Sequence, residues 1–244
     1  MGPRLNDCIA GLLSVCCLLL KRVSLFSCWV ALCQKPLSLP FMDLFANDPT
    51  TNLLPFDGTV NYFGPVLSST EAAFYYGYLL HEIPWKSDEV VIFGRRIVTA
   101  RKVAWYGDSG FSYAYSGTTK QALVWTEELA ALKATVERLT ATTFNSCLLN
   151  LYQDGGQGMS WHSDDEKSLG KDSTIASVSL GAEREFRLKH KRLDGKISVL
   201  LENGSLLVMK DTTQTHWLHS IPKTKKVTTP RINLTFRTMA SKTR

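Results

Sequence analysis

The feature that most constrains the fold is a series of short β-type segments that follows residue 143. Six segments are rich in β-branched or large apolar residues and are separated by turns: residues 144–152, 174–180, 185–190, 196–201, 205–210 and 231–238. Asp194-Gly195 and Asn203-Gly204 are dipeptides typical of tight turns between such strands. Many short strands with glycine turns predict a β-sandwich or barrel.

Two segments before this β-rich region carry the signals of α-helices. The first begins with a capping box at residues 68–71 and ends before Pro84. Its apolar residues recur at helical spacing: Phe74, Tyr75, Tyr78 and Leu79. Thr126 can cap a second helix with the same kind of stripe: Leu129, Leu132, Val136 and Leu139. We expect both helices to cover the β-core, which makes the fold class α+β and mainly β.

Composition divides the chain into three parts. Residues 1–41 hold two apolar runs split by Lys21-Arg22, and neither run has the roughly 20 residues needed to span a bilayer. We expect Met42 to be the true start and this leader to be a translation artefact, with a membrane anchor or targeting segment as the alternative. Residues 42–66 are rich in Pro, Asn, Asp and Gly and predict an extended arm. Residues 67–240 predict the folded domain.

A His-x-Asp pair and one distant histidine form the strongest chemical signal in the chain. On a strand, residues two apart point the same way, so His162 and Asp164 can reach one metal together. His219 supplies a third ligand from a distant strand, and His216 competes for this role. We prefer His219, because residues 217–220 precede a proline at a strand end. Two imidazoles and one carboxylate are the ligand set of a non-haem Fe(II) oxygenase.

Polar residues at alternating positions indicate a second ligand beside the metal. Arg231, Asn233 and Arg237 are separated by even numbers of positions, so one face of a strand would carry all three side chains. Two guanidiniums on one face can clamp a small dicarboxylate through charge-assisted hydrogen bonds. Asn150 and Tyr152 also share parity, on the strand that leads to the His-x-Asp pair, and their amide and phenol can reach the same ligand.

The order of these motifs resembles the AlkB family of Fe(II)/2-oxoglutarate-dependent nucleic-acid dealkylation dioxygenases, and the resemblance covers roughly residues 60–239. It implies a double-stranded β-helix, or jelly-roll, core. It also implies that Fe(II) is held by His162, Asp164 and His219. The same resemblance assigns 2-oxoglutarate to five residues: Asn150, Tyr152, Arg231, Asn233 and Arg237. With O2, the family chemistry is oxidative demethylation of bases of the 1-methyladenine and 3-methylcytosine type in DNA, with release of formaldehyde, succinate and CO2.

The resemblance places a nucleotide-recognition lid at about residues 90–117. Ile92, Phe93 and Gly94 resemble a hairpin that enters the base stack in AlkB relatives acting on double-stranded DNA, and such an apolar wedge can unstack a base step. The alternative is an ordinary strand end with its Phe in the core. The remaining expected substrate contacts are Arg101, Tyr113, Tyr115 and Glu166. The tyrosines can stack on a flipped base, or alternatively face the core.

Composition constrains the partner only weakly. The formal net charge of +6 is a mild bias toward nucleic acid, and the basic clusters at residues 189–192 and 223–226 can either contact phosphates or be merely solvated. Five of the six cysteines lie in the leader, and the single Cys147 of the body fits a reducing compartment, so we expect a cytoplasmic, nucleoid-associated or nuclear monomer. Alternatives to DNA demethylation are the same oxygenase chemistry on RNA, a protein or a small molecule, and a non-catalytic nucleic-acid-binding jelly roll.

Overall fold

The computed structural model describes residues 48–92, 95–108, 112–115 and 118–240, while the side chains of residues 88–97 and 112–120 stand outside this description. The described residues belong to the unit Asp43–Arg244, one of two into which the chain divides. The expected leader at residues 1–41 and the expected start at Met42 lie outside the described residues, so both stay predictions.

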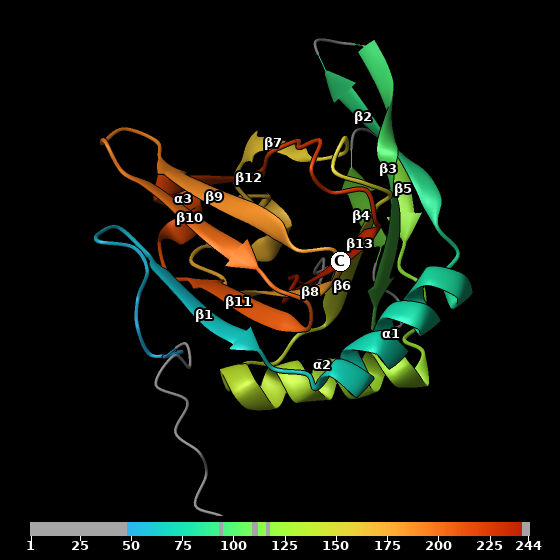
Figure 1. Cartoon of the computed structure of the whole chain (residues 1–244). Helices are drawn as coiled ribbons and strands as arrows, with labels where there is room; N and C mark the ends of the chain where they lie inside the picture. Colours follow the sequence, from blue (N-terminus) through green and yellow to red (C-terminus); the bar gives the residue numbers. More distant parts are fainter. Residues whose placement is uncertain (1–47, 93–94, 109–111, 116–117, 241–244) are drawn as a thin grey trace, which may run out of the picture. The chain divides into compact units, whose positions relative to one another are not determined.

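Eleven of the strands form two antiparallel sheets (Figure 1). The larger sheet has seven strands in the order β1 (Thr59–Pro65), β11 (Ser205–Lys210), β8 (Ile175–Gly181), β13 (Arg231–Arg237), β6 (Ser146–Tyr152), β3 (Arg95–Gly107) and β2 (Lys86–Ile92). The smaller sheet has four strands in the order β10 (Lys196–Leu201), β9 (Arg184–His190), β12 (Trp217–Ile221) and β7 (Met159–His162). A separate two-stranded ribbon pairs β4 (Ser112–Tyr115) with β5 (Thr118–Gln121).

The chain crosses between the two sheets as it runs from β6 to β13. β6, β8, β11 and β13 belong to the larger sheet, and β7, the β9–β10 hairpin and β12 belong to the smaller one. This alternation is the strand connectivity of a double-stranded β-helix, so the expected jelly-roll, mainly-β fold is confirmed. The six predicted strands of the β-rich half all form, each with bounds within two residues of the prediction.

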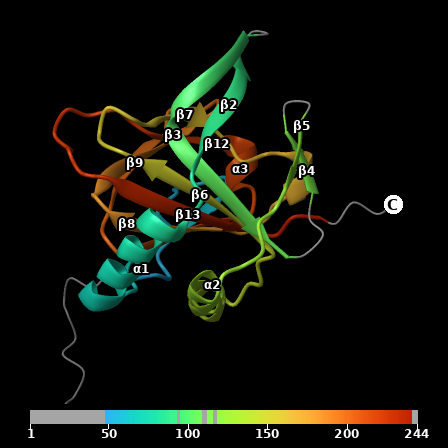
Figure 2. The same ribbon diagram turned by 90° about the vertical axis from the view of Figure 1, so that its right-hand side faces the viewer.

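The two predicted helices cover one face of the larger sheet (Figure 2). Helix α1 (Ser69–Glu82) begins with the expected capping box, and the Thr126 hydroxyl caps α2 (Glu127–Thr140). Fully buried leucines of both helices, Leu79 and Leu129 among them, pack on the sheet, and each contributes about 1.5–3 kcal/mol. The predicted stripe of α1 was wrong at Phe74, which is 58% exposed and faces away from the sheet. No helix in the described part of the chain combines the length and the apolar character that crossing a bilayer requires.

Strand β13 separates an apolar layer from a polar one. Ile232, Leu234 and Phe236 are fully buried in the cluster that contains the helices. The alternate residues, Arg231 and Asn233, point to the opposite face of the sheet, where the smaller sheet lies. The polar residues predicted to share one strand face therefore face the interior of the jelly roll rather than solvent.

Two regions differ from the sequence-based expectation. Residues 59–65, expected as part of an extended arm, form the edge strand β1, because they pair along the whole of β11. In the lid region, β2 and β3 form an antiparallel hairpin in which Ile92 pairs with Arg95, and this hairpin extends beyond the sheets in Figure 1. The β2–β3 ladder thus flanks the expected wedge, while Phe93 and Gly94 themselves lie outside the described residues.

Candidate metal and co-substrate site

His162 and His219 face each other across the β7–β12 ladder. They are direct register partners, and their ring centroids lie 4.2 Å apart. Phe186 of β9 packs against the other side of His219, with ring centroids 5.4 Å apart. One potential ligand atom from each of His162, Asp164 and His219 lies within 4.8 Å of the others. The predicted triad therefore converges from three segments of the fold.

Asp164 reaches this cluster by a route that the sequence did not predict. Strand β7 ends at His162, so Asp164 lies in the following loop and the alternation of side chains along a strand does not orient it. Two hydrogen bonds hold it instead. Its backbone N–H donates to Gln214 Oε1 at 2.9 Å, and its Oδ2 accepts from Arg237 Nη2 at 2.9 Å. Asp164 thus lies in the cluster, but the strand argument for it was wrong, and its role as a metal ligand stays a prediction.

The electrostatic environment prepares these groups to bind a cation. Burial lowers the pKa of His219 to about 3, so the ring is neutral near pH 7 and offers a lone pair. Burial acts to raise the pKa of Asp164, but the Arg237 guanidinium and the two imidazoles outweigh it and lower the pKa overall. Asp164 is therefore an ionised carboxylate. Its Oδ2 contacts Arg237, and its Oδ1 lies near His162. His162 Nδ1 lies 2.8 Å from the backbone oxygen of Ser160, a contact that directs Nε2 toward Asp164.

The competing histidine is separated from this site. His216 ends the short helix α3 (Thr213–His216), and its ring stacks on that of His190, with centroids 5.9 Å apart. The preference for His219 over His216 agrees with the geometry. His216 ends α3, whereas His219 lies within β12, and the two side chains belong to different groups of potential ligands.

The residues expected at the co-substrate meet across the β6–β13 ladder. Arg231 is the register partner of Tyr152, and Asn233 is the register partner of Asn150. The guanidinium carbon of Arg231 lies 5.6 Å from the centroid of the Tyr152 ring. Parity on each strand was read from the sequence, and the antiparallel register turns two separate pairs into one polar surface.

Arg231 is a buried cation in need of an anion. It is 1% exposed, and burial lowers its pKa to about 10. Its Nη2 donates to Ser179 Oγ at 2.9 Å and to Asn233 Oδ1 at 2.7 Å. Nε has no hydrogen-bond partner, and no acidic side chain pairs with Arg231 among the described residues. A buried guanidinium is costly without a counter-ion, so this position fits a carboxylate of a bound small molecule.

Several polar partners at this site were missed in the sequence. Ser177 Oγ donates to Asn233 Oδ1, and Asn233 Nδ2 donates to Thr235 Oγ1. Together with Ser179 they place hydroxyls of β8 and β13 beside Arg231. The available signal was the alternation of serine with apolar residues in β8, which sequence reasoning interpreted only as a strand.

Two of the expected substrate-contact residues lie at the edge of this site. Arg101 Nε donates to Asn150 Oδ1 at 3.1 Å, so it reaches a residue expected to bind the co-substrate. Glu166 Oε2 lies 3.8 Å from Arg237 Nη1. Burial raises the pKa of the Glu166 carboxyl. The side chains of Ile92, Phe93, Tyr113 and Tyr115, together with Gly94, lie outside the described residues, and their roles stay predictions.

The donor atoms present fit the groups that the resemblance implies. Two imidazoles with one carboxylate suit Fe(II), and the open side of such a set admits a chelating ligand. The buried guanidinium of Arg231 suits one carboxylate of 2-oxoglutarate. These two fits rest on separate residues from different strands.

Comparison with known proteins agrees with this site. The sequence matches the model of the 2OG-Fe(II) oxygenase superfamily over residues 59–237. DNA oxidative demethylase ALKBH2 of Homo sapiens is 44% identical over 156 residues, which cover 61% of this chain and 60% of that protein. Alpha-ketoglutarate-dependent dioxygenase alkB homolog 3 of Mus musculus is 38% identical over 171 residues, covering 66% of this chain and 59% of that protein. The chain thus spans less than two thirds of the length of these relatives.

The fold has a counterpart among solved structures. The structure of OsALKBH1 aligns with a TM-score of 0.53 and 16% sequence identity, and the alignment covers 76% of this chain and 98% of that one. At this level of identity the likeness concerns the fold alone.

Proposed function

Because the chain belongs to the 2OG-Fe(II) oxygenase superfamily and, within it, to the AlkB family, we propose that it removes N-alkyl groups from DNA bases by oxidative demethylation. The observation that carries the proposal is the convergence of His162, Asp164 and His219 in a domain that also buries the Arg231 guanidinium, which has no acidic partner among the described residues. When bound, Fe(II) and 2-oxoglutarate supply the oxidising power of the reaction with O2, and the products are succinate, CO2 and formaldehyde.

The protein contributes binding, orientation and charge. His162, Asp164 and His219 would hold Fe(II), and the neutral state of His219 near pH 7 means that the metal displaces no proton from it. Arg231 would hold a carboxylate of 2-oxoglutarate, with the Tyr152 ring beside it. Arg237 links the two halves of the site, because it bonds the metal ligand Asp164 from the strand that carries Arg231.

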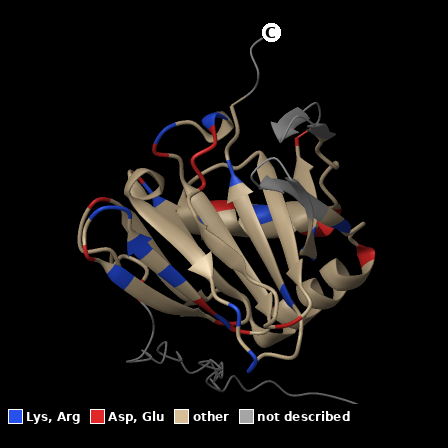
Figure 3. Cartoon of the chain, turned by 90° about the horizontal axis from the view of Figure 1, so that it is seen from above, with Lys and Arg blue, Asp and Glu red and all other residues tan. Residues whose placement is uncertain are grey.

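The surface beside the metal site supports nucleic acid as the substrate. A groove next to β7 is lined by Trp161, Arg187 and Lys223, among other residues. Trp161 is 40% exposed, and Lys189 Nζ lies 4.6 Å from its ring centroid. Figure 3 shows the lysines and arginines of the described chain in blue. Cations around an exposed aromatic ring suit phosphates and bases, and such contacts add affinity that falls with salt.

The β2–β3 hairpin supports duplex DNA in particular. A methylated Watson–Crick edge is inaccessible inside a duplex, so the base must leave the stack or already be unpaired. The antiparallel pairing of β2 with β3, in which Ile92 is the partner of Arg95, supports a hairpin turn at the segment expected to act as a wedge. RNA remains the second candidate substrate. We also propose a nuclear or cytoplasmic location, which a fluorescent fusion of the full chain would test.

The direct test is to incubate the protein with Fe(II), 2-oxoglutarate and oligonucleotides carrying 1-methyladenine or 3-methylcytosine. We expect a mass loss of one methylene from DNA, and His219→Ala should give none. Duplex substrates should lose activity in Phe93→Ala more than single strands do, because only the duplex requires unstacking. Equal or better turnover of single strands by the native protein would contradict the duplex assignment.

The rival substrates are separable by charge. Reversing Arg95, Arg96 and Arg101 to Glu should weaken turnover of DNA and reduce its salt dependence, because each basic contact to phosphate releases counter-ions. If DNA is not demethylated but 2-oxoglutarate is still consumed, the oxygenase acts on a protein or small molecule. If neither occurs and DNA still binds, the non-catalytic alternative holds.

A further inference from the structure

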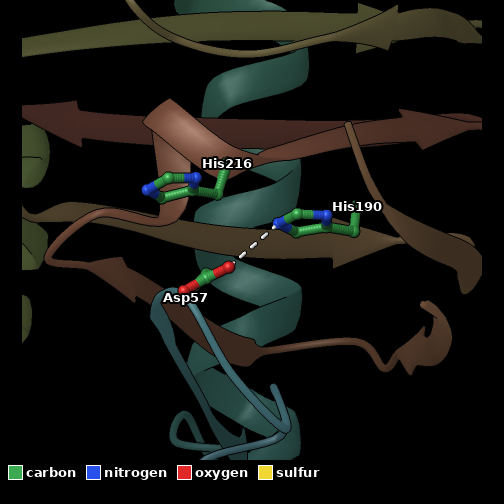
Figure 4. Close-up of side chains that lie close together, drawn as sticks. All are labelled: Asp57, His190 and His216. Carbon is green, nitrogen blue, oxygen red and sulfur yellow. Dashed lines mark ion pairs between the residues drawn. The ribbon is translucent and has the colours of Figure 1, made fainter. Parts of the chain in front are cut away.

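A second group of two histidines and one aspartate lies outside the proposed iron site. Asp57, His190 and His216 bring potential ligand atoms within 4.8 Å of one another (Figure 4). His190 Nδ1, however, accepts the backbone N–H of Leu193 at 2.8 Å and that of Arg192 at 3.3 Å. A neutral ring whose Nδ1 is an acceptor must carry its proton on Nε2, which lies 3.3 Å from Asp57 Oδ2. Nε2 therefore has no lone pair for a metal, and what the group provides is a close contact between the turn at Asp57 and the end of β9.

This group contacts α3, the short helix that directly precedes the strand of the proposed iron ligand His219. His216 is the last residue of α3, and Trp217 beside it donates through Nε1 to the Phe56 carbonyl at 3.2 Å. Thr213, the first residue of α3, accepts the backbone N–H of Thr59 at 2.9 Å. The N-terminal turn around Asp57 thus fixes both ends of a four-residue helix. Between those ends lies Gln214.

Gln214 is the residue of α3 that reaches the metal site. It is 7% exposed, and its Oε1 accepts the backbone N–H of Asp164 at 2.9 Å. Its Nε2 points to Met209 Sδ at 3.4 Å. The amide orientation is fixed by this network, because only the oxygen can accept from a backbone N–H.

Asp164 needs such support because it has left the sheet. β7 is an edge strand that ends at His162, and its one neighbour, β12, does not pair with the loop that carries the carboxylate. Arg237 holds the side chain of Asp164, whereas the backbone N–H of Asp164 is held by Gln214. Resting on the proposed iron site, we infer that Gln214 is a positioning residue for iron: it replaces the missing strand partner of Asp164 and fixes the direction of that ligand.

A third contact ties the same two segments together. Lys191 Nζ donates to the Gln214 carbonyl oxygen at 2.8 Å, and it lies 4.0 Å from Asp165 Oδ2. The loop after β7 and helix α3 are therefore bridged from the β9–β10 turn as well. Of these contacts only the Gln214 side chain reaches the backbone of a metal ligand, so its loss should change metal binding more than it changes the fold.

The test is a Co(II) titration of the native full chain and of three variants. The ligand-field absorption of the bound metal reports the binding. Gln214→Met keeps the length of the side chain and removes the acceptor, whereas Gln214→Glu keeps an acceptor oxygen. Gln157→Met is the matched control. Gln157 Oε1 also accepts a backbone N–H, that of Gln153 at 3.0 Å, but this hydrogen bond involves none of the proposed metal ligands. We expect the Co(II) dissociation constant of Gln214→Met to rise about 10- to 100-fold.

Two further variants test whether the acceptor oxygen of Gln214 is responsible for the change in metal affinity. Gln214→Glu should recover part of the affinity, and Gln157→Met should bind like the native chain. The Fe(II) concentration for half-maximal turnover should rise in Gln214→Met by more than kcat falls at saturating Fe(II). Native-like Co(II) affinity and spectrum in Gln214→Met would overturn the positioning role while leaving the iron site intact. Failure of the native chain to bind Co(II) would overturn the iron site and the positioning role together.

Discussion

Arg237 Nη2 donates a hydrogen bond of 2.9 Å to Asp164 Oδ2. This bond joins β13, the last strand in the sequence, to the loop that carries a proposed metal ligand. The other carboxylate oxygen, Oδ1, lies 3.8 Å from His162 Nε2. One oxygen of Asp164 is thus engaged by the protein, and the other faces the histidines. A guanidinium on the strand that also carries Arg231 therefore couples the geometry of the metal site to that of the co-substrate site.

Replacing Asp164 should abolish metal binding without unfolding the chain. Asp164→Ala removes one of three ligands, so we expect loss of Co(II) binding and of iron-dependent turnover. Asp165→Ala is the matched control, because its neighbouring carboxylate has a 68% exposed side chain and takes no part in the triad. Co(II) titration and circular dichroism of both variants measure the effect. Normal demethylation by Asp164→Ala would refute the metal assignment.

Arg231 should determine the response to 2-oxoglutarate. A ligand at about a hundredfold excess over its dissociation constant stabilises the native state by about 2.7 kcal/mol. We expect 2-oxoglutarate to stabilise the metal-loaded native chain by this amount, which appears as a rise in Tm. Arg231→Met should show almost no rise, because the buried counter-charge for the carboxylate is gone. Arg187→Met, which removes a half-exposed arginine of β9, should respond like the native chain. An unchanged response in Arg231→Met would place the carboxylate elsewhere.

The metal-free protein should lose stability on acidification because of His219. Its pKa is about 3 in the fold against the usual 6.5, so below pH 6.5 the unfolded chain binds a proton that the native fold does not. The contribution is therefore complete above about pH 6.5 and declines as the pH falls toward 3. Between about pH 6.5 and about pH 4.5 this predicts a loss on the order of 2–3 kcal/mol.

Urea unfolding of chelator-treated protein across this pH range measures that slope. His219→Gln keeps a polar side chain of similar size and removes the titrating group, so its unfolding free energy should depend less on pH than that of the native chain. An equal pH dependence in both proteins would show that other groups dominate the acid response.

Metal stoichiometry should distinguish the two groups of histidines. We expect one Co(II) per chain, because His190 of the second group offers no free lone pair. His219→Ala should reduce the stoichiometry to zero, whereas His216→Ala, three residues away, should leave it at one. Two equivalents in the native chain, falling to one in His216→Ala, would show that the Asp57 group binds metal after all.

The sequence alone determined the chemistry-bearing residue types and their local directions. Alternation within one strand placed Arg231 and Asn233 on one face, and the β-rich pattern after residue 143 predicted the strands that carry them. Only the tertiary structure decided the register that pairs Arg231 with Tyr152, the exit of Asp164 from the sheet, and the separation of His216 from His219. The physical reason is that side-chain period is a local property of a strand, whereas register and loop position depend on hydrogen bonds between segments far apart in the chain.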